Sequence, residues 1–92
     1  MDLNGWPHLR LLLEAASSLQ PLQVWLFGSA LRSEHPADLD VLLVYEDRSA
    51  VVALRKMEPW EDFQPPFHII AMTPREVDEY EFIKSTRAVR LI

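Results

Sequence analysis

The sequence predicts one small α/β domain of the α+β kind, in which helices flank a mixed sheet of three to four strands. Short runs rich in Val, Leu, Ile and aromatic residues alternate with segments whose apolar residues recur at three- and four-residue steps. The length agrees, because a chain of 92 residues has room for one shared core and not for a separate substrate domain. We therefore expect a single domain over residues 1–92.

The first expected element is a helix over residues 6–19. Its apolar stripe consists of Leu9, Leu12, Leu13, Ala16 and Leu19. Pro7 suits a first helical turn, and Asn4 is the expected N-cap. The same spacing places His8 on the exposed side of this helix.

Three strands are expected at Gln23–Phe27, Leu39–Tyr45 and Phe67–Met72. The second contains a continuous apolar run, which is typical of a central strand covered on both faces. A brief helical turn over Ala30–Ser33 follows the first strand, and Val89–Ile92 is expected to add a short terminal strand.

Two further helices complete the order. Polar residues 46–49 cap a helix over Ala50–Met57, whose buried stripe is expected to be Val51, Leu54 and Met57. Thr73-Pro74-Arg75-Glu76 is a capping box with proline at the first helical position, and its helix is expected to run to about Thr86. The prolines of residues 59–66 predict a loop.

Composition narrows the classes of partner. The formal net charge is −5, which argues against broad binding of nucleic acid or of an anionic membrane, because both depend on a basic field. The absence of cysteine excludes disulfides and thiolate metal sites. No apolar run approaches the roughly 20 residues of a membrane span, and no signal peptide is evident, so a cytoplasmic location without membrane binding is the expectation.

Chemistry-bearing residues gather between the first two strands. The first strand ends in Gly28-Ser29, and after eight residues Asp38-Leu39-Asp40 opens the next. Side chains alternate along a strand, so both carboxylates are expected on one side, as a hard-cation site for Mg²⁺. Gly28 would let the backbone approach a phosphate, and Ser29 would donate a hydrogen bond to it. Taken singly, each feature is more commonly a polar strand entrance or an ordinary turn.

These residues resemble a known family. Leu26-Phe27-Gly28-Ser29-Ala30-Leu31-Arg32, followed by Asp38-Leu39-Asp40-Val41-Leu42-Leu43, is similar to the core of the polymerase-beta-like nucleotidyltransferases, and of their minimal members in particular. The resemblance implies that Gly28 and Ser29 hold the phosphates of a nucleoside triphosphate and that Asp38 and Asp40 bind the metal. It also puts Arg32 where many minimal members have an arginine, as a phosphate contact or a solvated helix end.

Three departures from the family pattern stand out. The spacer of eight residues between Ser29 and Asp38 is slightly short, and Ala37 replaces a serine common in relatives. The strand at Phe67–Met72, which would supply a third carboxylate, contains no acid and has His68 at about that place. His68 could ligate a metal or act as a base, or it could simply fill a partly polar position beside the aspartates.

Other acids and His35 are weaker candidates for the site. Glu46, Asp47 and Asp62 could replace the missing acid only if their loops folded back over the site. His35 is interpreted as turn filler, with a ligand contact as the alternative.

Two main functions remain open at this stage, with a nucleotide-binding sensor without turnover as a third and weaker one. One is Mg²⁺-dependent transfer of a nucleoside monophosphate from a nucleoside triphosphate to a hydroxyl acceptor. The other is a catalytically inactive binding module, for which the resemblance implies an antitoxin-type partner of a helical toxin-like domain. Either function implies a protein partner or a second copy of the chain, because a substrate platform would come from another subunit.

Overall fold

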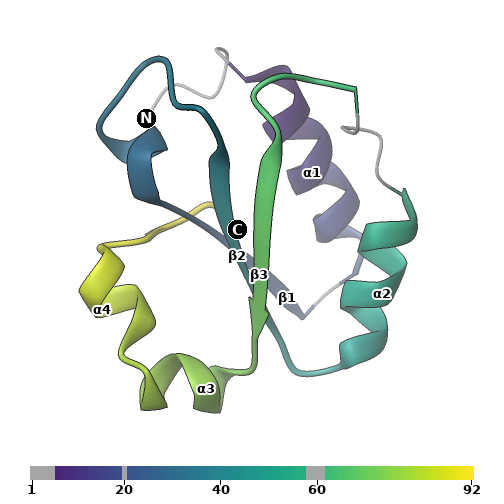
Figure 1. Ribbon diagram of the computed structural model, residues 1–92. Coiled ribbons are helices and arrows are strands. Elements are labelled where there is room, and N and C mark those ends of the chain that lie inside the picture. The colour runs from purple at the N-terminus through teal and green to yellow at the C-terminus, as the bar shows by residue number, and fades with distance from the viewer. Residues whose placement is uncertain (1–5, 20, 58–61) are drawn as a thin grey trace.

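A computed structural model describes residues 6–19, 21–57 and 62–92 (Figure 1). The elements in chain order are α1 (Pro7–Ser17), β1 (Leu22–Phe27), the 3-10 helix η2 (Gly28–Leu31), β2 (Leu39–Tyr45), α2 (Arg48–Met57), β3 (Phe67–Met72), α3 (Pro74–Glu79), α4 (Phe82–Thr86) and β4 (Val89–Arg90). Among these residues, no helix has both the length and the apolar character needed to cross a membrane.

The strands form one mixed sheet in the order β3-β2-β1-β4. β1 pairs antiparallel with β2 and with β4, whereas β2 and β3 are parallel because the chain crosses between them through α2. The expected small α+β domain is confirmed, and the terminal segment contributes β4 at Val89–Arg90. The end of β1 and the starts of β2 and β3 meet at the same end of this sheet.

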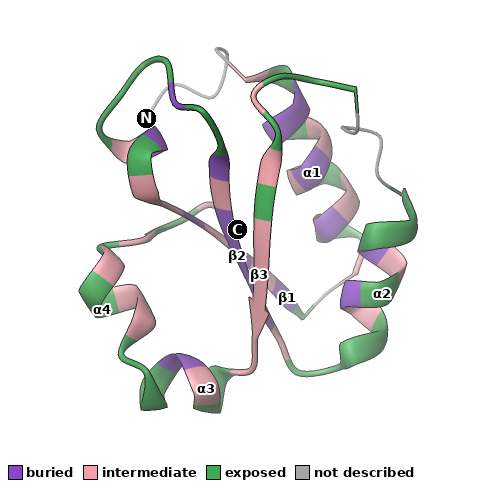
Figure 2. Cartoon of the chain, viewed as in Figure 1, coloured by how far each residue is buried: buried purple, intermediate pink, exposed green. Residues whose placement is uncertain are grey.

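Helices cover both faces of the sheet, so the domain has three layers (Figure 1). Alternate residues of β2 divide between them: Val41 and Leu43 belong to the core under α1 and α2, whereas Leu42 and Val44 pack with Val77 of α3. This explains the continuous apolar run of β2, which Figure 2 shows buried along most of its length. The face under α3 and α4 has fewer buried side chains, and α4 has none.

His8 contradicts the sequence prediction, because it is buried with 1% of its surface exposed. Its ring stacks on Phe63 at 5.5 Å between centroids and lies 5.0 Å from Phe67. His8 Nε2 also lies 2.8 Å from the carbonyl oxygen of Pro65, as its hydrogen-bond donor. Helical spacing gave the wrong result because the segment before β3, more than fifty positions along the chain, covers this side of α1.

The C-terminal helix was expected to run unbroken to Thr86, and this prediction is also wrong. α3 ends at Glu79, and Glu81, with φ of 48°, turns the chain before α4 begins at Phe82. The capping box at its start is confirmed: Thr73 Oγ1 accepts from the Glu76 N–H, and the Glu76 carboxylate accepts from the Thr73 N–H.

Smaller differences concern α1 and α2. Pro7 is in the first turn of α1, as predicted, whereas Asn4 lies outside the described residues. The helix α2 begins at Arg48, earlier than expected, because the Asp47 carboxylate accepts from the Ser49 N–H and caps it there. Met57 is 47% exposed, so the buried stripe of α2 is Val51 and Leu54.

Candidate functional site

The site expected from the sequence lies where β1 ends and β2 begins. Gly28 has φ of 77°, a left-handed conformation that suits glycine, and it turns the chain from β1 into η2. A Cβ added at this position would overlap the carboxylate of Asp40, with Oδ2 as the nearest atom. Glycine is therefore required here both for the backbone conformation and for the close approach of Asp40.

Asp40 is the central residue of this site. It is the second residue of β2 and pairs with Phe27 of β1 on one side and with His68 of β3 on the other. Its side chain is 21% exposed, and its Oδ1 lies 3.1 Å from His68 Nδ1. An ionised carboxylate only accepts hydrogen bonds, so His68 Nδ1 is the donor. The two carboxylate oxygens thus face different neighbours, Oδ1 toward His68 and Oδ2 toward Gly28.

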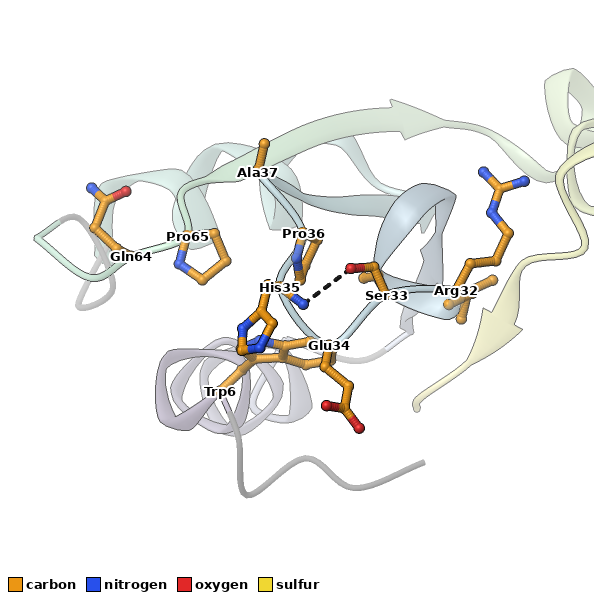
Figure 3. Close-up of a pocket in the computed structure, with 11 residues that line it drawn as sticks. Trp6, Arg32, Ser33, Glu34, His35, Pro36, Ala37, Gln64 and Pro65 are labelled. Carbon is orange, nitrogen blue, oxygen red and sulfur yellow. Dashed lines mark hydrogen bonds between the residues drawn. The ribbon is translucent and has the colours of Figure 1, made fainter.

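The other predicted residues lie around this contact. Ser29 is exposed in η2, and its carbonyl oxygen accepts from the N–H groups of Arg32 and Ser33. Arg32 is exposed at the end of η2, and Figure 3 shows its guanidinium turned away from Trp6 and His35. Asp38 is exposed and lies just before β2 begins, so the regular alternation of the strand does not extend to it.

The structure brings Gly28, Asp40 and His68 together but does not assemble a larger ligand set. Within residues 6–19, 21–57 and 62–92, no group of three or more His, Asp or Glu side chains is arranged to hold a metal ion. Glu46, Asp47 and Asp62, named as replacements for a third acid, therefore complete no such group with Asp38 and Asp40.

The donor set can be compared with what Mg²⁺ requires. This ion binds proteins through one or two carboxylates and completes its octahedron with water and substrate phosphates. Asp40 offers one carboxylate, with Oδ2 facing the Gly28 turn, and Asp38, exposed just before β2, would have to supply a second. A second divalent ion needs further negative charge, and His68 adds none in its neutral form. These carboxylates would therefore fit at most one Mg²⁺ and do not fit two.

A cavity of about 940 Å³ lies beside this site without including it (Figure 3). It is lined by Trp6, by residues 30–37 and by Gln64 and Pro65. Gly28, Asp38, Asp40 and His68 are not among the lining residues. Sequence reasoning named His35 as a residue that might contact a ligand but missed Trp6 and Glu34. No local pattern could have found Trp6, because its partners in the cavity lie more than twenty positions away.

Comparison with known proteins supports the family resemblance. The nucleotidyltransferase domain family model matches residues 9–91, which is nearly the whole chain. The chain belongs to this nucleotidyltransferase domain family. None of the curated proteins and none of the solved structures compared with the chain matches it.

Proposed function

We propose that this nucleotidyltransferase-like domain binds a nucleoside triphosphate with one Mg²⁺ ion and acts through binding rather than through efficient nucleotidyl transfer. The observation that carries the proposal is the contact between His68 Nδ1 and Asp40 Oδ1 at 3.1 Å. His68 lies directly across from Asp40 in the parallel register, at about the place where the family pattern has its third carboxylate.

The charge of the site supports this reading. Transfer with two divalent ions relies on carboxylates that neutralise both cations and help to deprotonate the attacking hydroxyl. A neutral imidazole supplies no negative charge, and its hydrogen bond occupies one oxygen of Asp40. Asp38 and Asp40, beside the Gly28 turn, would hold a single ion, which would supply positive charge for the phosphates.

A second candidate is Mg²⁺-dependent transfer of a nucleoside monophosphate to a hydroxyl acceptor. In this reaction the acceptor oxygen bonds to the α-phosphorus, pyrophosphate leaves, and the hydroxyl proton passes to a base. The exposure of His68 favours this candidate: its side chain is 64% exposed, and Nε2 is free to accept a proton when Nδ1 donates to Asp40.

The proposal includes a protein partner, either a helical domain of the kind that antitoxin-type family members bind or a second copy of the chain. The large apolar side chains exposed on the described surface are Val52, Met57, Phe63, Tyr80 and Val89. Light scattering on the purified chain, alone and after mixing with candidate helical partners, measures this association. A strictly monomeric chain that binds none of them would contradict the partner part of the proposal.

Isothermal titration with ATP and GTP, with and without Mg²⁺ or Mn²⁺, tests nucleotide binding. We expect metal-dependent binding that is lost in an Asp38→Ala/Asp40→Ala variant and kept in Glu14→Ala, which removes an exposed carboxylate from α1. A parallel assay of pyrophosphate release measures transfer. Turnover at the 1 s⁻¹ or faster that is typical of enzymes would favour the second candidate, and absence of binding would overturn both.

A further inference from the structure

The cavity of about 940 Å³ shares no lining residue with the carboxylate site, which consists of Gly28, Asp38, Asp40 and His68. Trp6 and Leu31 line the cavity and pack against the core beneath α1 and α2. Asp40 shares the other face with Leu42, two residues further along β2, which packs in the core beneath α3. The cavity is also far larger than a metal ion or a phosphate needs, and its volume falls in the range of sites for small organic ligands.

The walls of the cavity suit a flat ring. Trp6 is half-buried against the core, so its indole offers a supported aromatic surface. Pro36 is buried, and Pro65 is held in place because its carbonyl oxygen accepts a hydrogen bond from the buried His8. A planar ligand can stack on such a tryptophan with little loss of side-chain freedom.

The polar groups of the cavity select the ligand's chemistry. Glu34 is exposed, and its carboxylate makes no hydrogen bond or ion pair with any residue in the described ranges. Trp6 and Glu34 both line the cavity, and in Figure 3 the guanidinium of Arg32, another lining residue, is turned away from Trp6. The lining of the cavity therefore includes an acceptor with negative charge and an aromatic ring, which together favour a planar ligand with N–H donors.

We propose that this cavity binds a guanine-type base, stacked on Trp6 and held by Glu34. Among the common nucleobases, guanine presents two adjacent N–H donors, N1–H and the 2-amino group, and these match the two oxygens of one carboxylate. The base would enter between the loop of residues 33–37 and the Gln64-Pro65 segment. This inference does not depend on the proposed metal and triphosphate site.

The test uses nucleosides, because they lack the phosphates through which the carboxylate site would bind. Guanosine is titrated into the full chain up to its solubility limit, and binding is followed by calorimetry and by tryptophan fluorescence. Inosine, which differs only by the missing 2-amino group, is the matched ligand. Glu34→Gln, Trp6→Ala, Asp40→Asn and the surface control Glu14→Gln are titrated in the same way.

We expect guanosine to bind and to quench fluorescence, and inosine to bind about tenfold more weakly because one charge-assisted hydrogen bond is lost. Glu34→Gln should weaken guanosine binding about tenfold, while Asp40→Asn and Glu14→Gln leave it unchanged. Glu34 is exposed, so its replacement tests the site even if Trp6→Ala destabilises the fold. No binding of guanosine, equal binding of inosine, or a loss in Asp40→Asn but not in Glu34→Gln would each overturn the proposal. Metal-dependent ATP binding would be unaffected by such a failure.

Discussion

The carboxylate of Asp40 occupies the space in which a side chain at Gly28 would begin. β1 ends and β2 begins at this contact, since Phe27 pairs with Asp40 in the antiparallel register. The same carboxylate reaches His68 on the other side, 3.1 Å from Oδ1 to Nδ1. The half-buried side chain of Asp40 thus links the turn after β1 to the edge strand β3.

Gly28→Ala should destabilise the domain by about 1–3 kcal/mol, because alanine would be strained at a φ of 77° and would overlap Asp40. Urea denaturation of both proteins measures the difference. Combining it with Asp40→Ala should recover part of the loss, since only the backbone strain remains. The exposed Ser29→Ala is the control and should change stability by less than about 0.5 kcal/mol. A Gly28→Ala protein as stable as the parent would show that the contact is relieved by a small shift.

His68→Asp should add the missing third carboxylate beside Asp40. We expect the variant to bind Mn²⁺ more tightly, so that its melting temperature rises with added Mn²⁺ more than that of the parent. Without metal it should be less stable than the parent, because two carboxylates would face each other across β2 and β3. His68→Asn is the matched control, since it removes the imidazole without adding charge. An equal rise in melting temperature with Mn²⁺ in all three proteins would contradict the assignment of His68 to the position of the third carboxylate.

The capping box of α3 predicts a pH dependence of stability. The pKa of Glu76 is lowered from its ordinary value, chiefly by the backbone hydrogen bond from Thr73 and then by the Thr73 side chain. A depressed folded-state pKa contributes stability that is present above the unfolded-state value and is lost as pH falls through the folded-state value. The difference in free energy of unfolding between the parent and Glu76→Gln should therefore shrink as pH falls below about 4.5.

Urea denaturation at pH 7, 5 and 3 measures this difference. Glu14→Gln, exposed on α1, is the control and should show no comparable trend. A gap between the parent and Glu76→Gln that is constant over this range would contradict the role assigned to the Glu76 carboxylate.

His8→Ala should lower the free energy of unfolding by about 2–3 kcal/mol, because it removes a buried ring and the hydrogen bond to Pro65. His8→Phe keeps a ring for the stack with Phe63 and should lose less. Nδ1 of His8 is buried without a hydrogen-bond partner, which is a further reason for phenylalanine to be tolerated. Denaturation followed by circular dichroism measures both variants, and Arg87→Ala at an exposed position of the C-terminal segment serves as the control.

The strands and the local helix signals were predictable because they depend on neighbours in the chain. The apolar run of β2 and the capping box at Thr73 and Glu76 were found where the sequence placed them. The break between α3 and α4 was missed because Glu81, the residue in the left-handed conformation, carries no glycine-like signal. The burial of His8 was missed because a distant loop covers it.

The sequence by itself determined the α+β class and the turn at Gly28, since each follows from local periodicity or from a motif of adjacent residues. Only the tertiary structure decided that His68 faces Asp40, that Asp40 fills the space beside Gly28, and that Trp6 and Glu34 border one cavity. These contacts join residues from separate elements, and they are fixed by strand register and by packing on the two faces of the sheet.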